Sequence, residues 1–83
     1  MHKVNIIKLI ADPSRWALLS LLKSGPRPVS ELTAGSRLSQ SLVSHHLQSL
    51  RIGKLVTGVR SGRQVSYRLT NEGRRVTTVL EQI

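Results

Sequence analysis

The stretch VSELTAGSRLSQSLVSHHLQSL, residues 29–50, decides the fold because it predicts two helices separated by a very short turn. The first helix is expected to start at Val29 or Ser30. Ser39 is a good N-cap for the second, expected over 39–51. Between the helices lie about three or four residues, which is the spacing of a helix-turn-helix. The second helix is expected to turn one stripe towards the core, consisting of Leu42, Val43, His46, Leu47 and Leu50.

The opposite face of this second helix is polar and contains no acid. Helical geometry places on it Gln40, Ser41, Ser44, His45, Gln48 and Arg51. Solvated helix faces usually mix Glu and Lys, whereas these side chains can donate to and accept from base edges in a major groove. The alternative is a capping serine followed by an incidental polar surface. We predict a phosphate contact at Ser39 and base or DNA contacts from Gln40, Ser41, Ser44, His45 and Gln48.

After Gly53 the apolar period changes from helical to alternating, which predicts two strands. Residues 55–59 and 64–69 are expected to form a β-hairpin whose turn is centred on Ser61-Gly62. Arg60 and Arg63 would then flank the tip of a wing that contacts the DNA backbone or the minor groove. The alternative is that these arginines only keep an exposed hairpin soluble.

The flanking segments complete the order of elements. Asp12-Pro13 is a good helix start, and Gly25-Pro26 stops that helix before an extended linker. A last helix is expected to be capped by Thr70 or Asn71. The predicted fold is therefore mainly α with a β-hairpin wing, a winged helix-turn-helix of order α-α-α-α-β-β-α, formed by one domain over residues 1–83.

The terminal helices, expected over about 2–11 and 71–83, are predicted to serve dimerisation. The first wraps apolar residues around most of its circumference, so it must be covered from more than one direction. In so short a chain the second cover could be another subunit. The residues predicted for dimerisation are Val4, Ile7, Val76, Val79, Leu80 and Ile83.

Charge points to a polyanionic partner. Thirteen Lys and Arg stand against four Asp and Glu, a formal charge of +9. Between Leu32 and Asn71 there is no acid, while six cations fall in this interval. Such a basic surface is typical of nucleic-acid binding, although a soluble basic face is the simpler explanation. The cations are Arg37, Arg51, Lys54, Arg60, Arg63 and Arg68.

Composition narrows the remaining classes of function. The absence of cysteine excludes disulfides and thiolate metal sites. Adjacent side chains such as His45 and His46 point about 100° apart on a helix and cannot chelate one ion, so we expect neither metal nor cofactor. No apolar run is long enough to cross a membrane or to form a secretory signal, which predicts a cytoplasmic protein without a membrane partner.

Other classes of function are the alternatives to a sequence-specific DNA-binding protein. A winged-helix module that binds an acidic protein would bind any duplex weakly. An RNA-binding domain is disfavoured because Trp16 and Tyr67, expected in the core, are the only aromatics. A non-specific nucleic-acid-binding protein stays an alternative. An enzyme is the least favoured class, since the sequence shows no carboxylate pair, activated nucleophile or phosphate loop.

Three segments resemble the ArsR/SmtB family of winged-helix repressors. The segment ADPSR (11–15) with the following leucines is similar to the family's second helix. LSQSLVSHHLQSL (38–50) is similar to its recognition helix, and RSGR (60–63) with VSYRL (65–69) to its wing. The resemblance, over about residues 10–72, implies a homodimer built on the first and last helices that binds a palindromic operator as a repressor.

The sequence departs from this family in two kinds of position. No Cys-x-Cys stands in the third helix and no histidine in the last, so metal sensing does not carry over. Ser36 and Arg37 stand where Leu and Gly are usual, and Lys54 replaces another turn Gly.

Overall fold

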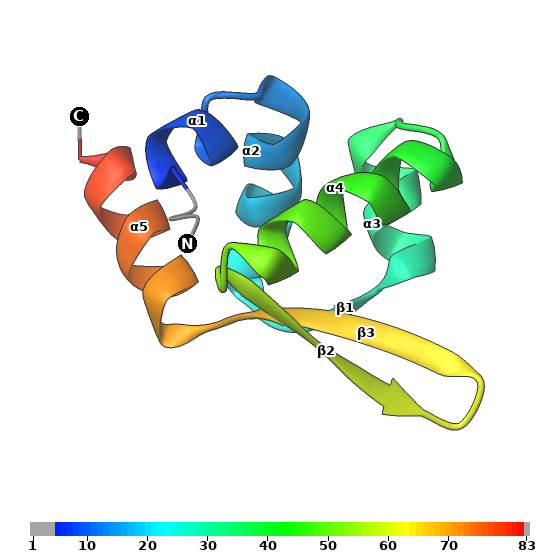
Figure 1. The fold of residues 1–83 in the computed structure, drawn as a ribbon. Helices are drawn as coiled ribbons and strands as arrows, with labels where there is room; N and C mark the ends of the chain where they lie inside the picture. The colour runs from blue at the N-terminus through cyan, green and yellow to red at the C-terminus, as the bar shows by residue number, and fades with distance from the viewer. Residues whose placement is uncertain (1–4, 83) are drawn as a thin grey trace.

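The computed structural model describes residues 5–82, which form a helical body from which a β-hairpin projects (Figure 1). The elements are, in chain order, α1 (Ile6–Ile10), α2 (Pro13–Leu21), a 3-10 turn η1 (Leu22–Ser24), β1 (Arg27–Pro28), α3 (Val29–Ser36), α4 (Gln40–Ile52), β2 (Val56–Ser61), β3 (Gln64–Leu69) and α5 (Asn71–Glu81). This is the predicted winged helix-turn-helix with one additional short strand.

The helix-turn-helix consists of α3 and α4. Ser39 caps α4 as predicted, because its Oγ accepts a hydrogen bond from the Leu42 N–H at 3.2 Å. Helix α3 begins at Val29 and ends at Ser36, and its C-cap, Arg37, has a left-handed φ of 60°. This backbone conformation ends a helix and usually selects Gly. The sharp turn that separates the two helices therefore uses a strained arginine.

The wing consists of β2 and β3, which pair antiparallel from Val56↔Leu69 to Ser61↔Gln64. Because Ser61 and Gln64 are paired, the turn is Gly62-Arg63, and the expected Ser61-Gly62 centre was wrong by one residue. Gly62 has a φ of 62°, and Gly at the first position of a two-residue hairpin turn matches the twist of the strands. Arg63 thus lies in the turn itself.

The linker between α2 and α3 is extended, as the prolines predicted, but it also joins the sheet. Arg27 pairs with Tyr67 and Pro28 with Ser66, which makes β3 the central strand. The Arg27 guanidinium donates to the Leu21 carbonyl at 2.9 Å, to Ser24 Oγ at 2.9 Å and to the Glu31 carboxylate at 3.2 Å. The side chain of Arg27 therefore connects the end of α2 with the start of α3, and its backbone joins both to β3 of the wing.

The core is aliphatic and lies between α2, α3, α4 and the root of the wing. Trp16 and Tyr67 pack against it, half-buried, as expected. Leu42 was expected in the core, but 47% of it is exposed, so this prediction was wrong. The stripe of α4 is already complete without Leu42, because four other residues of the helix are buried: Val43, His46, Leu47 and Leu50.

Helix α5 is fastened to the segment before β2 by Thr70. The Thr70 N–H donates to the Leu55 carbonyl at 3.0 Å, and its hydroxyl donates to the Lys54 carbonyl at 2.6 Å. The same hydroxyl accepts from the Gly73 N–H at 3.0 Å, so Thr70 is also the N-cap of α5. Gly73 and Thr77 are the buried residues of this helix. Across residues 5–82, every helix is too short or too polar to span a bilayer.

Helix α1 lies beside α5 at one end of the body (Figure 1). Asn5 caps it through a hydrogen bond from the Lys8 N–H at 3.1 Å, so the helix starts later than the expected segment 2–11. Arg15 Nε donates to the Leu9 carbonyl at 2.6 Å and holds α1 on α2. Val4 and Ile83, both predicted to contribute to dimerisation, lie outside the described residues.

Candidate nucleic-acid interface

A polar groove of about 600 Å³ runs between α4 and the wing. Its helical wall is one row of α4 side chains, spaced about one turn apart: Gln40, Ser44, Gln48 and Arg51. Its other wall comes from the wing, with Arg63 from the turn and Tyr67 from β3. The predicted site residues that the groove brings together are Gln40, Ser44, Gln48 and Arg63.

The other predicted residues lie on the surface outside this groove. Ser41 and His45 are exposed on α4 and form a second row beside the first. Ser39 is exposed at the helix start, where its hydroxyl is engaged as the cap. Arg60 is exposed on β2. The structure therefore divides the polar face of α4 into a row that faces the wing and a row that does not.

Three basic residues complete the surface. Arg51 lines the groove at the C-terminal end of α4 and also borders the depression at the root of the wing that includes Lys54. Lys54 is exposed and has a φ of 63°, so it holds a left-handed turn that usually takes Gly. Arg37, also left-handed, precedes the capping serine. Both departures from the family's turn glycines thus place cations next to the two ends of α4.

Arg51 and the wing residues Val65 and Tyr67 were missing from the predicted site. The spacing of Arg51, three residues after Gln48, was a usable signal, because it continues the same row of the helix. Tyr67 was assigned to the core, and it is half-buried there, but it also lines the groove. No periodicity in the sequence distinguishes a strand residue that is shared between a core and a groove.

His46 is buried, as predicted, with 9% exposed. Its Nδ1 atom is buried without a hydrogen-bond partner. The ring lies 5.6 Å from that of His45, centroid to centroid, with the planes tilted by 58°. Within residues 5–82, no three His, Cys, Asp or Glu side chains are grouped so that they could hold a metal ion.

Asp12 caps the start of α2. Its carboxylate accepts hydrogen bonds from the backbone N–H groups of Ser14 at 2.8 Å and Arg15 at 3.1 Å. The Arg15 N–H is the largest cause of a pKa for Asp12 below its ordinary value of 3.8; burial opposes this effect, and the Ser14 N–H and the charge of Arg15 act with it. The carboxylate is therefore ionised at neutral pH and serves as a cap.

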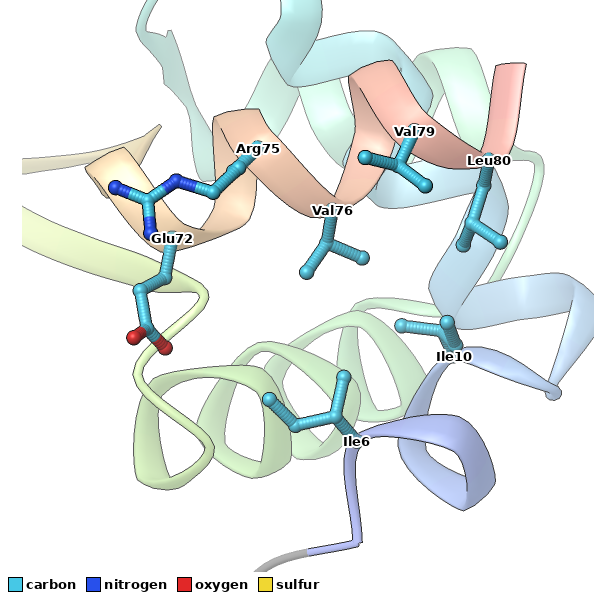
Figure 2. A pocket seen from close by; sticks show the side chains of 7 residues that line it. All are labelled: Ile6, Ile10, Glu72, Arg75, Val76, Val79 and Leu80. Carbon is cyan, nitrogen blue, oxygen red and sulfur yellow. The ribbon is translucent and has the colours of Figure 1, made fainter. Parts of the chain in front are cut away.

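A second, apolar groove of about 380 Å³ lies at the opposite end, between α1 and α5. Figure 2 shows Val76 and Leu80 of α5 pointing across it towards Ile6 and Ile10 of α1, with Glu72 and Arg75 at one end. Val79, which also lines the groove, is 56% exposed, and Ile7, next to Ile6 in the chain, is 77% exposed. Large aliphatic side chains are seldom left in water in such a cluster without a partner surface.

Residues 12–57 of the chain match the family described as bacterial regulatory protein, arsR family. The HTH-type transcriptional repressor SmtB of Mycobacterium tuberculosis is 41% identical over 66 residues, which cover 80% of this chain and 49% of that protein. The chain thus spans about half the length of the curated mycobacterial relatives that it matches.

Two solved structures carry the same fold. HlyU from Vibrio cholerae superposes with a TM-score of 0.85 at 31% identity, over 93% of this chain and 85% of that one. A fragment of Mb0332 from Mycobacterium bovis, described as a homodimeric winged helix-turn-helix DNA-binding domain, superposes with a TM-score of 0.79 at 31% identity. That match covers 90% of this chain and 69% of the fragment.

Proposed function

Since the chain belongs to the ArsR family of bacterial regulatory proteins, we propose that it is a transcriptional repressor that binds a specific DNA duplex as a homodimer. The observation that carries this proposal is the exposed, acid-free face of α4 beside the wing. Its relatives are named as regulators and repressors. These names agree with the expectation that the chain is not an enzyme.

The two rows of α4 suggest how the duplex is bound. Helix α4 enters the major groove with its N-terminal half foremost, so Ser41 and His45 meet base edges. The row of α4 that faces the wing follows the sugar-phosphate strand that borders the major groove. Arg51 on the α4 wall and Arg63 on the wing wall contact this strand from the two sides. Gln40 and Ser44 lie nearest the bases in that row, and Gln48 extends it. The capping serine with the first N–H groups of α4 takes a phosphate.

Dimerisation is proposed through α1 and α5. The support is the apolar groove, the exposed side chains of Ile7 and Val79, and the homodimeric state of the similar M. bovis domain. Two copies joined in this way present two α4 helices, which fit half-sites about 34 Å apart, one turn of B-DNA. The operator is then an inverted repeat.

Selection from a random duplex library at physiological salt tests DNA binding. An enriched inverted repeat is the expected result, and equal binding to all duplexes contradicts the proposal. His45→Ala is expected to relax base preference at particular positions. Arg63→Ala is expected to weaken binding to all sequences alike and to reduce the slope of log K against log salt by up to about one unit per lost phosphate contact.

Dimerisation has its own measurement. Val79→Glu places a charge on the proposed interface without touching the core, so the monomer remains folded and the dimer is lost. Light scattering at micromolar concentration gives the mass, and circular dichroism verifies the fold. Thr78→Glu, at a neighbouring exposed position of α5, is the matched control for the added charge. A wild-type chain that is monomeric at this concentration would contradict the proposed assembly.

A further inference from the structure

Leu42 is exposed in the first turn of α4, next to the side chains proposed to meet DNA. It is 47% exposed and does not belong to the partly buried aliphatic residues that pack against the core. The core-facing stripe of the helix is filled without it. The position of Leu42 therefore serves neither the interior of the domain nor the groove between α4 and the wing.

The remaining large exposed aliphatic side chains in residues 5–82 have different surroundings. Ile7 and Val79 belong to the terminal helices, and Val59 belongs to the outer strand of the wing. Ile52 is the last residue of α4. Leu42 alone among them is in the first turn of the recognition helix, where side chains reach furthest into a major groove. His45 follows it by three residues and is its neighbour on the helix surface.

We propose that Leu42 contacts the 5-methyl group of a thymine in each half-site and so contributes to sequence recognition. Thymine is the base of DNA that presents a methyl group in the major groove, and apolar side chains recognise it by contact. A leucine beside Ser41 and His45 gives the outer row of α4 one apolar point between hydrogen-bonding groups. This inference rests on the proposed function, because it assumes that α4 enters a DNA duplex.

Replacement of single thymines by deoxyuridine in the selected operator removes only the methyl group. Burial of one such group is worth about 0.8 kcal/mol, which corresponds to a fourfold change in Kd. The wild-type protein is expected to lose about fourfold in affinity at one thymine position per half-site, and about fifteenfold when both symmetric positions are changed. Other thymine positions are expected to be insensitive.

The Leu42→Ala variant is expected to bind the thymine operator more weakly than the wild type does. It is expected to bind the thymine operator and the deoxyuridine operator with the same affinity. Because Leu42 is exposed, the variant keeps the fold, which circular dichroism verifies. Ile52→Ala is the matched control, since Ile52 is an exposed aliphatic residue at the other end of the same helix. This control is expected to keep the wild-type preference for thymine.

Each other outcome is decisive. If Leu42→Ala loses the same affinity on both operators, or keeps the preference for thymine, Leu42 does not contact the methyl group and the inference is overturned. The same holds if the selected operator contains no thymine, while DNA binding itself stands. If the wild-type chain selects no sequence from the library, the proposed function itself is contradicted. This failure is distinguishable from failure of the Leu42 inference, because it is seen before any thymine is replaced.

Discussion

Gly73→Ala tests whether α5 is held as tightly against the segment before β2 as the structure indicates. A Cβ atom on Gly73 would lie 2.0 Å from the Leu55 carbonyl oxygen, where ordinary van der Waals contact begins near 3.4 Å. The Leu55 oxygen belongs to the backbone, and the position of the added Cβ is fixed by the backbone of Gly73. Rotation of a side chain therefore cannot relieve the contact. Helix α5 must therefore move by about 1.4 Å relative to Leu55.

This movement breaks the local hydrogen bonds. The bonds from Thr70 to the Leu55 and Lys54 carbonyls are worth about 1 kcal/mol each, and the loosened contacts of Val76 and Thr77 add about 1–2 kcal/mol. Alanine in a helix returns at most about 1 kcal/mol. The expected net loss is about 2–3 kcal/mol, from a total of roughly 4–12 kcal/mol for a chain of this length. The melting temperature is expected to fall by about 10–20 °C.

Gly35→Ala is the matched control, because Gly35 is also a helical glycine. Its added Cβ would meet Leu21 Cδ1 and Cδ2 at 3.2 Å, and this flexible side chain can yield. The control is expected to be as stable as the wild type or up to about 1 kcal/mol more stable. Thermal and urea unfolding at equal protein concentration, followed by circular dichroism, compare the two variants. A Gly73→Ala protein as stable as Gly35→Ala would refute the close contact.

Three further predictions concern the caps and turns. Asp12→Ala is expected to lower the free energy of unfolding by about 1 kcal/mol at neutral pH, measured by urea titration, and an unchanged value would mean that the cap of α2 is dispensable. Because the pKa of Asp12 is lowered in the folded state, its stabilising effect is present above about pH 4 and is lost as the pH falls through the lowered pKa. Asp12→Asn is therefore expected to lose less stability than the wild type between about pH 6 and pH 2.5, and equal losses would contradict this assignment. Lys54→Gly is expected to raise stability by roughly 0.5–1 kcal/mol because it relieves the left-handed backbone, whereas Lys54→Ala, which keeps the strain, is expected to gain nothing.

The sequence predicted the fold well because its strongest signals are local. Caps at Asp12 and Ser39, the breaker at Gly25-Pro26 and the change of period after Gly53 each act within a few residues, and the structure confirms them. The match of residues 12–57 likewise confirms the resemblance to the ArsR/SmtB family. Most predicted elements are therefore found within two or three residues of their expected ends.

The features that were missed depend on contacts between distant segments. The pairing of β1 with β3 joins residues about forty positions apart, and periodicity cannot indicate it. Leu42 continues the apolar pattern of α4 although the space beneath that helix is already filled. Gly73 gives no signal of its own, because only the approach of the Leu55 carbonyl excludes a side chain there. The contacts of individual residues with DNA and with a second subunit stay predictions.

Arg27 fastens the wing to the helical body, because its side chain bonds to the end of α2 and to α3 while its backbone pairs with Tyr67 of β3. The hairpin is held at its base on both sides, by β1 and by α4, which favours a fixed spacing between the wing and α4. If the chain binds DNA as proposed, the duplex then supplies the flexibility, and sequences whose minor groove narrows or widens easily are favoured at positions that no side chain contacts. Under the proposed function, Arg27 thereby contributes to the choice of operator although it is not among the residues proposed to contact DNA.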